Sequence, residues 1–284
     1  MKIVAAVCAA LLLTGCTAKP AEDPAAAAAS EAAKARQAVP TTAPSAAPPG
    51  KVTAPPQPAE LTKNPIYHVG KLTAHCQEPK IKPTSVANVR AYYTHLTACL
   101  NAAWAPVIRK AGFTFTPPKL DVVAGKSADL PCDEDAYGIY CGDTIYINAQ
   151  IDLDYFREDP EPAVGTMAFV IGHEYGHHVQ ALAGISEAAY QRGLKLNGVD
   201  LALEETRRHE LQASCFGGVY FGANHDFRKG PDWPKTFGEI VASTSDPQYD
   251  HGSAKNHARW SMAGFAAADP AACNTYAAPS GQVG

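Results

Sequence analysis

Three side chains that could perform metal chemistry, His173, Glu174 and His177, lie close together in an otherwise apolar stretch. Residues four apart on a helix are separated by about 40° around its axis, so the two histidines face the same side and could bind one tetrahedral ion. Glu174 is rotated by about 100° from His173, which suits a proton acceptor beside the ion better than a ligand. This is the His-Glu-x-x-His pattern of zinc hydrolases; the alternative is a buried helix with incidental histidines.

The element that must carry this motif is a helix, predicted from Pro162 to about Gly184. His178 lies about 100° further round this helix than His177 and is expected to pack or to support the site from outside. Gly172 and Gly176 each cost a helix about 1 kcal/mol. Both fall on one side, where we expect close packing against a strand.

A catalytic zinc ion of this type keeps three protein ligands and one water, so another segment must supply the third ligand. A second predicted helix, from about Asp200 to Gly222, offers Glu204, Glu205, His209 and Glu210. Glu210 is the best candidate, because the apolar and small residues after it indicate that the helix enters the core there. Glu204 and Glu205 lie among arginines, which is typical of a solvated face. His209 points about 100° away from Glu210 and is expected at the surface.

The remaining pattern predicts helices around a small sheet. Apolar residues at helical spacing indicate a helix from Ser85 to about Lys110, and a further helix is expected from about Ser253 to Ala267. Two short strands are predicted at Lys119–Ala124 and Thr144–Asn148, joined through a turn-rich connector at Pro131–Gly138. These elements indicate an α+β domain over residues 61–284.

The N-terminal residues are typical of secretion. Residues 1–16 contain a lysine, an apolar run and the ending Leu13-Thr-Gly-Cys16, which resembles a bacterial lipoprotein signal lipidated at Cys16. The alternative is an ordinary secretory signal with an incidental cysteine. Residues 17–60 are rich in Ala and Pro and predict a disordered tether. We therefore expect a protein of the bacterial cell envelope, anchored on the extracytoplasmic side of the membrane.

The six cysteines of the domain agree with that compartment, since an even set in a secreted chain indicates disulfides. Six cysteines allow fifteen pairings and the sequence does not choose among them. The pairing that we expect is Cys132–Cys141 as a local clip, with Cys76–Cys99 and Cys215–Cys273. The formal net charge of −4 and the lack of a basic stripe make nucleic acid an unexpected partner.

Taken in order, the motifs resemble those of the bacterial neutral zinc metallopeptidase family. The matching segments are His173–Gln180, Glu210–Cys215, His251-Gly252 with Arg259-Trp260, Cys273–Tyr276, Cys99–Trp104, Tyr140-Cys141 and Ile145–Ile147. The resemblance covers roughly residues 65–276 and is far more specific than the zinc motif alone. It implies a zincin-like fold with zinc as cofactor, a glutamate third ligand at Glu210, and the Cys215–Cys273 disulfide.

One position departs from the family pattern. The family usually has Glu-Leu-Gln-Ala-Asp, and Ser214 replaces that aspartate here. In related zincins with a glutamate ligand, the aspartate orients a zinc histidine. Loss of such a partner typically costs 10–100-fold in metal affinity or activity. Ser214 can still accept a hydrogen bond, so two hypotheses remain. One is a zinc peptidase, and the other is a zinc-binding but catalytically weak protein that binds or scaffolds envelope partners.

For a peptidase, the residues predict a mechanism on peptide or protein substrates. Glu174 would accept a proton from the water activated by zinc and deliver it to the departing amine. The developing oxyanion needs another donor, for which we favour His251 because its segment is part of the resemblance. Tyr249 and His257 are alternatives for this role. Equally, His251 could cap or support the helix at Ser253–Ala267.

Overall fold

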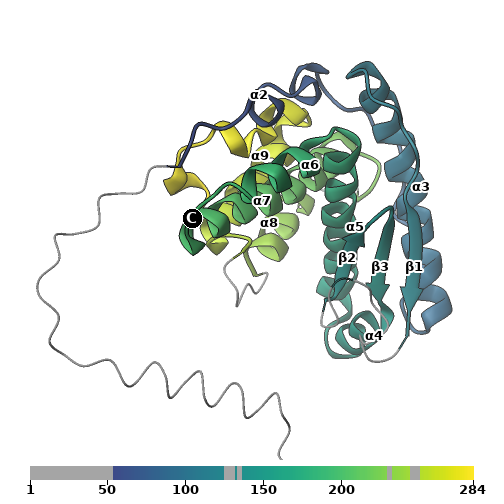
Figure 1. Ribbon diagram of the computed structural model, residues 1–284. Helices are drawn as coiled ribbons and strands as arrows, with labels where there is room; N and C mark the ends of the chain where they lie inside the picture. Colours follow the sequence, from purple (N-terminus) through teal and green to yellow (C-terminus); the bar gives the residue numbers. More distant parts are fainter. Residues whose placement is uncertain (1–53, 125–131, 133–135, 229–231, 244–249) are drawn as a thin grey trace, which may run out of the picture. The chain divides into compact units, whose positions relative to one another are not determined.

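The computed structural model describes residues 54–124, 132, 136–228, 232–243 and 250–284. The predicted signal and most of the predicted tether lie outside this part of the chain. Within it, helices predominate and a small sheet lies between α3 and α5 (Figure 1). The predicted α+β class is confirmed.

The helices have the following bounds: α2 Ala59–Thr62, α3 Val86–Lys110, α4 Ala149–Glu158, α5 Pro160–Leu182, α6 Ile185–Gly193, α7 Val199–Ala223, α8 Trp233–Ser243 and α9 Ala254–Ala267. Short 3-10 helices occur at Pro65–His68, Pro270–Cys273, Thr275–Ala277 and Ser280–Gln282. The predicted helices correspond to α3, α5, α7 and α9, whereas α2, α4, α6 and α8 were not predicted.

The sheet has three strands in the order β1-β3-β2. The predicted strands are present as β1 (Lys119–Val123) and β3 (Thr144–Asn148), which pair in parallel. The last residue of the predicted connector and the three residues after it form the unpredicted strand β2 (Gly138–Cys141), antiparallel to β3. β2 is one of the two edge strands and contacts α5. The sheet therefore presents one edge strand to the helix that carries the histidine motif.

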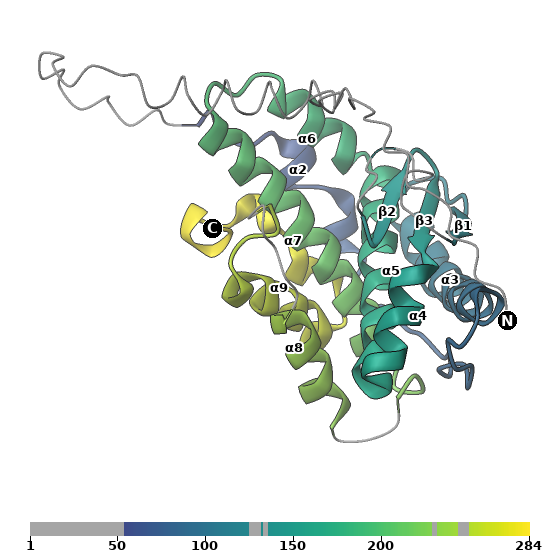
Figure 2. The same ribbon diagram turned by 90° about the horizontal axis from the view of Figure 1, so that it is seen from below.

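Helix α7 lies between α5 and α9 (Figure 2). Gly176 in α5 permits the α5–α7 contact, because a Cβ atom there would lie 2.2 Å from the carbonyl oxygen of Ala213. At Gly172 a Cβ would meet the Phe221 ring at 2.7 Å. The expectation that these glycines pack against a strand is wrong: they pack against a helix. This close approach sets the distance between the two helices that carry the predicted metal ligands.

Three disulfides have the predicted pairing: Cys76–Cys99, Cys132–Cys141 and Cys215–Cys273. The last of these joins α7 to the segment after α9, and its cysteines are fully buried. It therefore fixes the C-terminal segment against the centre of the helix that carries Glu210.

The first turns of α7 are held by buried ion pairs. Glu205 is 6% exposed and pairs with Arg192 at 3.0 Å. The Arg192 guanidinium also donates to the carbonyl oxygens of Pro55 and Pro56 at 2.7 and 3.0 Å. The interpretation of Glu205 as part of a solvated face is therefore wrong. Residues 54–60, which the sequence assigned to the tether, belong to the folded unit.

Candidate metal centre

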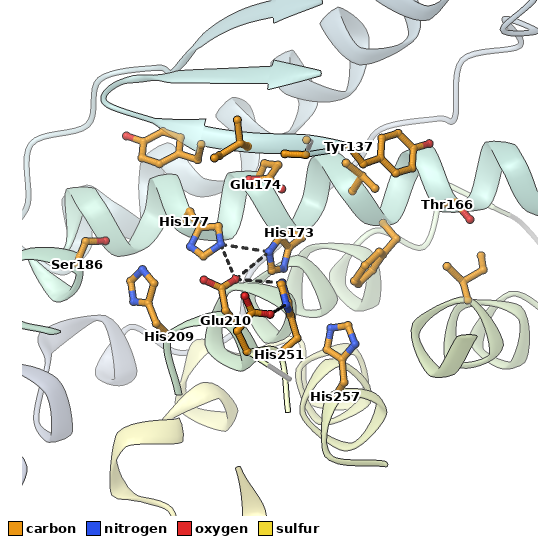
Figure 3. A pocket seen from close by; sticks show the side chains of 18 of the residues that line it. Tyr137, Thr166, His173, Glu174, His177, Ser186, His209, Glu210, His251 and His257 are labelled. Atoms are coloured by element: carbon orange, nitrogen blue, oxygen red, sulfur yellow. Dashed lines mark hydrogen bonds and ion pairs between the residues drawn. The ribbon is translucent and has the colours of Figure 1, made fainter. Parts of the chain in front are cut away.

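Three predicted ligands converge at the α5–α7 contact. The Nε2 atoms of His173 and His177 are 3.1 Å apart, and Oε2 of Glu210 lies 3.3 Å and 3.0 Å from them, respectively. Figure 3 shows the three side chains turned toward one point. The convergence depends on an unbroken α5, which starts with Pro160 at its first position and ends before Gly184, whose φ is +70°.

This donor set fits a zinc ion. Zinc bonds to imidazole nitrogen and carboxylate oxygen are about 2.0–2.2 Å long, which places two tetrahedral ligands about 3.3 Å apart. The three distances above are close to that value. Two imidazoles and one carboxylate, each offering one atom, form the ligand set of a catalytic zinc site with an open position.

Hydrogen bonds behind the histidines leave their Nε2 atoms directed at this point. His173 Nδ1 lies 2.8 Å from Oγ of the fully buried Ser214. His177 Nδ1 lies 2.9 Å from Oε1 of Gln180, which is also fully buried. Both partners are neutral. The contribution of Gln180 was missed from the sequence, although its spacing of three residues from His177 on one helix is a usable signal.

The cluster concentrates charge on Glu210. Burial alone would raise the pKa of Glu210, but the charge of His177 and hydrogen bonds from His173, His177 and His251 outweigh burial, and the pKa lies well below its usual range. Burial lowers the pKa of His173. For His177, burial is outweighed by the charge and hydrogen bond of Glu210, which raise its pKa to about 9. Glu210 is thus ionised at neutral pH, as a zinc ligand must be.

His251 also reaches the cluster. Its Nε2 lies 3.3 Å from Glu210 Oε2, and its Nδ1 lies 2.7 Å from Oδ1 of Asp250. It does not cap α9, because the hydroxyl of Ser253 accepts the capping hydrogen bond from the Asn256 amide. Asp250 was missed from the sequence. Asp250 precedes His251 outside any helix or strand, so no helical or strand spacing indicates that the two side chains interact.

The two alternative donors to the oxyanion were Tyr249 and His257. Tyr249 lies outside the described residues. His257 directs its Nε2 to Ser214 Oγ at 2.7 Å, so this nitrogen is engaged behind His173.

The sequence predicted His209 at the surface, but the side chain is partly buried beside the cluster. Its ring centroid is 5.1 Å from that of His177, and its Nδ1 lies 3.1 Å from the hydroxyl of Tyr276. Burial, together with the nearby charge of His177, lowers the pKa of His209 to about 3, so it is neutral near pH 7.

His178 lies apart from the cluster and packs as expected. Its Nε2 is 2.9 Å from the carbonyl oxygen of Thr116, and its Nδ1 is 3.2 Å from the hydroxyl of Tyr140. Burial lowers its pKa to about 4. Its role is to connect α5 to the chain around the sheet.

The cluster lies in a cleft of about 1000 Å³, and Glu174 lines it beside His173. Glu174 is 6% exposed and lies close to β2: a Cβ atom on Gly138 would be 3.3 Å from its Cγ. Figure 3 shows it on the opposite side of His173 from Glu210. The lining also includes the apolar or aromatic residues Ala136, Tyr137, Ile139, Tyr140, Tyr155, Phe169, Val170, Ala181 and Ile240. The cleft thus combines a polar centre with apolar walls.

One wall of the cleft is supported by a buried carboxyl group. Asp152 in α4 is fully buried, and its Oδ1 accepts hydrogen bonds from the hydroxyls of Tyr93 and Tyr137. Its Oδ2 has no hydrogen-bond partner among the described residues. Burial raises the pKa of Asp152 to about 7, although the two tyrosine hydrogen bonds act in the opposite direction.

Asp152 should make folding stability depend on pH. Between pH 4 and pH 7 the folded chain holds a proton on Asp152 that the unfolded chain releases, so this stability contribution is present at low pH and lost as pH rises. Relative to Asp152→Asn, we expect the unaltered protein to lose about 2 kcal/mol of unfolding free energy between pH 5 and pH 7. Urea unfolding of both proteins measures the difference, with Asp154→Asn on the same helix as control. If the unfolding free energies of the unaltered protein and Asp152→Asn changed in parallel with pH, the raised pKa of Asp152 would be contradicted.

Comparisons with known proteins agree with this geometry. The model of a family described as "Putative neutral zinc metallopeptidase" matches residues 68–230, which contain His173, Glu174, His177 and Glu210. The chain is 28% identical to the protein YpfJ of Escherichia coli K12 over 204 residues, covering 64% of this chain and 69% of YpfJ. It is 26% identical to Rv2575 of Mycobacterium tuberculosis H37Rv over 210 residues, covering 63% and 68% respectively. Both relatives are named as uncharacterized proteins. No solved structure matches this chain.

Proposed function

Since the chain belongs to the neutral zinc metallopeptidase family, we propose that it is a zinc-dependent endopeptidase acting on peptides or proteins. One observation carries the proposal. His173, His177 and Glu210 converge within hydrogen-bonding distance in a cleft that Glu174 also lines. A structural metal site would need no proton acceptor beside it and no cleft wide enough for a substrate.

Each residue of the cluster has a separate role. Zinc bound by His173, His177 and Glu210 would supply Lewis acidity, which acidifies a water molecule and polarises a carbonyl group. Glu174 accepts a proton from the attacking water and delivers it to the nitrogen of the departing amine. Its location between the cluster and β2 is suited to both transfers, because a water at the cluster would lie on one side of Glu174 and a peptide along β2 on the other.

His251 supplies the donor for the carbonyl oxygen as it becomes negative. Asp250 accepts from His251 Nδ1, which directs Nε2 into the cleft. Burial by itself lowers the pKa of His251, but the hydrogen bond and charge of Glu210, together with Asp250, raise it to about 9. A protonated ring offers Nε2–H as a donor in the cleft, which suits His251 to oxyanion stabilisation.

Strand β2 supports a peptide as substrate. Its residues Gly138, Ile139 and Tyr140 line the cleft, and β3 is its only strand neighbour within the described part of the chain. An extended peptide can add to such an edge through backbone hydrogen bonds, with alternate side chains placed against the cleft walls. This arrangement favours an endopeptidase, because it binds the chain on both sides of the cleaved bond.

We also propose a lipid anchor at Cys16, which would place the enzyme at the extracytoplasmic face of a bacterial membrane. The support is the Leu13–Cys16 pattern and the Ala- and Pro-rich tether that follows it. In the described residues no helix has the length and apolar character to cross a bilayer. A Cys16→Ala chain should no longer incorporate a radiolabelled fatty acid, and unchanged incorporation would contradict an anchor at this cysteine.

The purified full chain tests the peptidase proposal directly. We expect about one zinc ion per chain by mass spectrometry and cleavage of members of a broad peptide library. A chelator should abolish cleavage, and added zinc should restore it. A chain that holds zinc but cleaves nothing in the library would support the scaffold hypothesis. A chain that holds no zinc would contradict both.

A further inference from the structure

Behind His173 lies a continuous chain of buried hydrogen bonds that crosses three helices. Ser214 in α7 is fully buried, and its Oγ lies 2.8 Å from His173 Nδ1 in α5 and 2.7 Å from His257 Nε2 in α9. His257 is 3% exposed. One hydroxyl group therefore bridges two imidazoles, only one of which belongs to the predicted ligand set.

The requirements of metal binding set the donor and acceptor roles along this chain. For Nε2 of His173 to offer its lone pair to a metal ion, the ring proton must be on Nδ1, which then donates to Ser214 Oγ. The single hydroxyl proton of Ser214 is left for its other neighbour, and His257 Nε2 can accept it. In this arrangement each bond has one donor and one acceptor, and the lone pair of His173 faces Glu210.

The backbone holds these groups at fixed separations. At Gly218, one turn after Ser214, a Cβ atom would lie only 2.2 Å from the carbonyl oxygen of Ser261 in α9. The Cys215–Cys273 disulfide lies next to Ser214 in the chain. Helices α7 and α9 therefore approach at backbone distance, and Ser214 and His257 cannot separate without unpacking them.

We propose that Ser214 and His257 form a positioning relay that fixes the Nδ1-protonated form of His173 and thereby strengthens zinc binding. The proposal rests on the zinc-binding part of the proposed function and not on peptidase activity. His257 is a positioning residue here, since it acts through Ser214 and His173. Without an acceptor at His257, the Ser214 hydroxyl proton can turn toward His173 Nδ1, which favours the wrong imidazole tautomer.

Zinc affinity of the full-length chain, measured by competition with a chromophoric chelator, tests the relay. We expect Ser214→Ala and His257→Leu each to weaken zinc binding by about 10-fold or more. His257→Gln retains an acceptor near the position of Nε2 and should stay within about 3-fold of the unaltered chain. The double variant Ser214→Ala with His257→Leu should bind zinc no more weakly than Ser214→Ala alone, because both changes interrupt the same chain of hydrogen bonds. Ser261→Ala is the matched control, since it removes a fully buried hydroxyl from α9 outside the relay.

A spectroscopic measurement separates positioning from mere packing. In zinc-free, nitrogen-15-labelled protein, where no metal fixes the tautomer, the His173 Nδ1 proton should give a slowly exchanging signal that persists in His257→Gln and disappears in His257→Leu. If Ser214→Ala does not fold, the two His257 variants still decide the result. Unchanged affinity and an unchanged His173 signal in His257→Leu would overturn the relay alone. An unaltered chain that binds no zinc would overturn the proposed function as well.

Discussion

Replacing Glu174 with glutamine is expected to reduce peptide hydrolysis by about 1000-fold while the chain keeps its zinc ion. The amide has nearly the same shape but cannot accept a proton from water. Zinc should remain, because Glu174 is not one of the three converging donors. The measurement is kcat/KM on the best library peptide, together with the zinc content of the same preparation.

A matched control is Glu187→Gln, the same chemical change on the exposed surface of α6. It should leave both activity and zinc content unchanged. Activity of Glu174→Gln above about one-tenth of the unaltered level would assign the proton transfer to another group. Loss of zinc from this variant would instead place Glu174 among the ligands.

Substituting Gly176 by alanine is expected to destabilise the fold by about 3 kcal/mol and to weaken zinc binding strongly. The new Cβ would lie 2.2 Å from Ala213 O and 2.7 Å from Ala213 Cα, and backbone atoms of a packed helix cannot turn aside as a flexible side chain can. The helices α5 and α7 must therefore separate. That separation moves Glu210 away from His173 and His177. Thermal unfolding should show a midpoint lower by about 6–12 °C.

Gly193→Ala provides the control, since a Cβ atom there meets nothing within 4 Å. This change should be neutral or slightly stabilising, because it restricts the unfolded chain. A Gly176→Ala protein within about 1 kcal/mol of the unaltered one would mean that the two helices separate easily. The metal site would then not depend on their close contact.

The sequence predicted the parts of the site that depend on local spacing. His173 and His177 lie on one helix, so their shared face follows from helical geometry. Glu210 could be chosen because the residues after it change from charged to apolar. The structure brings these three together, and the cysteine pairing also agrees with expectation.

Features that depend on distant partners were not predictable in the same way. Strand β2 has four residues after a turn-rich segment, and it is a strand only because β3 pairs with it. Glu205 appeared solvated because its partner Arg192 lies in another helix. The same reason applies to His257, whose contact with Ser214 spans 43 residues of sequence. Such contacts form only when helices pack, and no single segment encodes them.

The hydrogen bonds between Arg192 and the first described residues have a mechanical consequence. Its guanidinium holds the carbonyl oxygens of Pro55 and Pro56 and also pairs with Glu205. A pull on the chain at residue 54 is therefore borne first by these hydrogen bonds and passes directly into α6 and α7. Helix α7 carries Glu210 little more than one turn beyond Glu205, so tension on the N-terminal segment would act on the helix that supplies the third metal ligand.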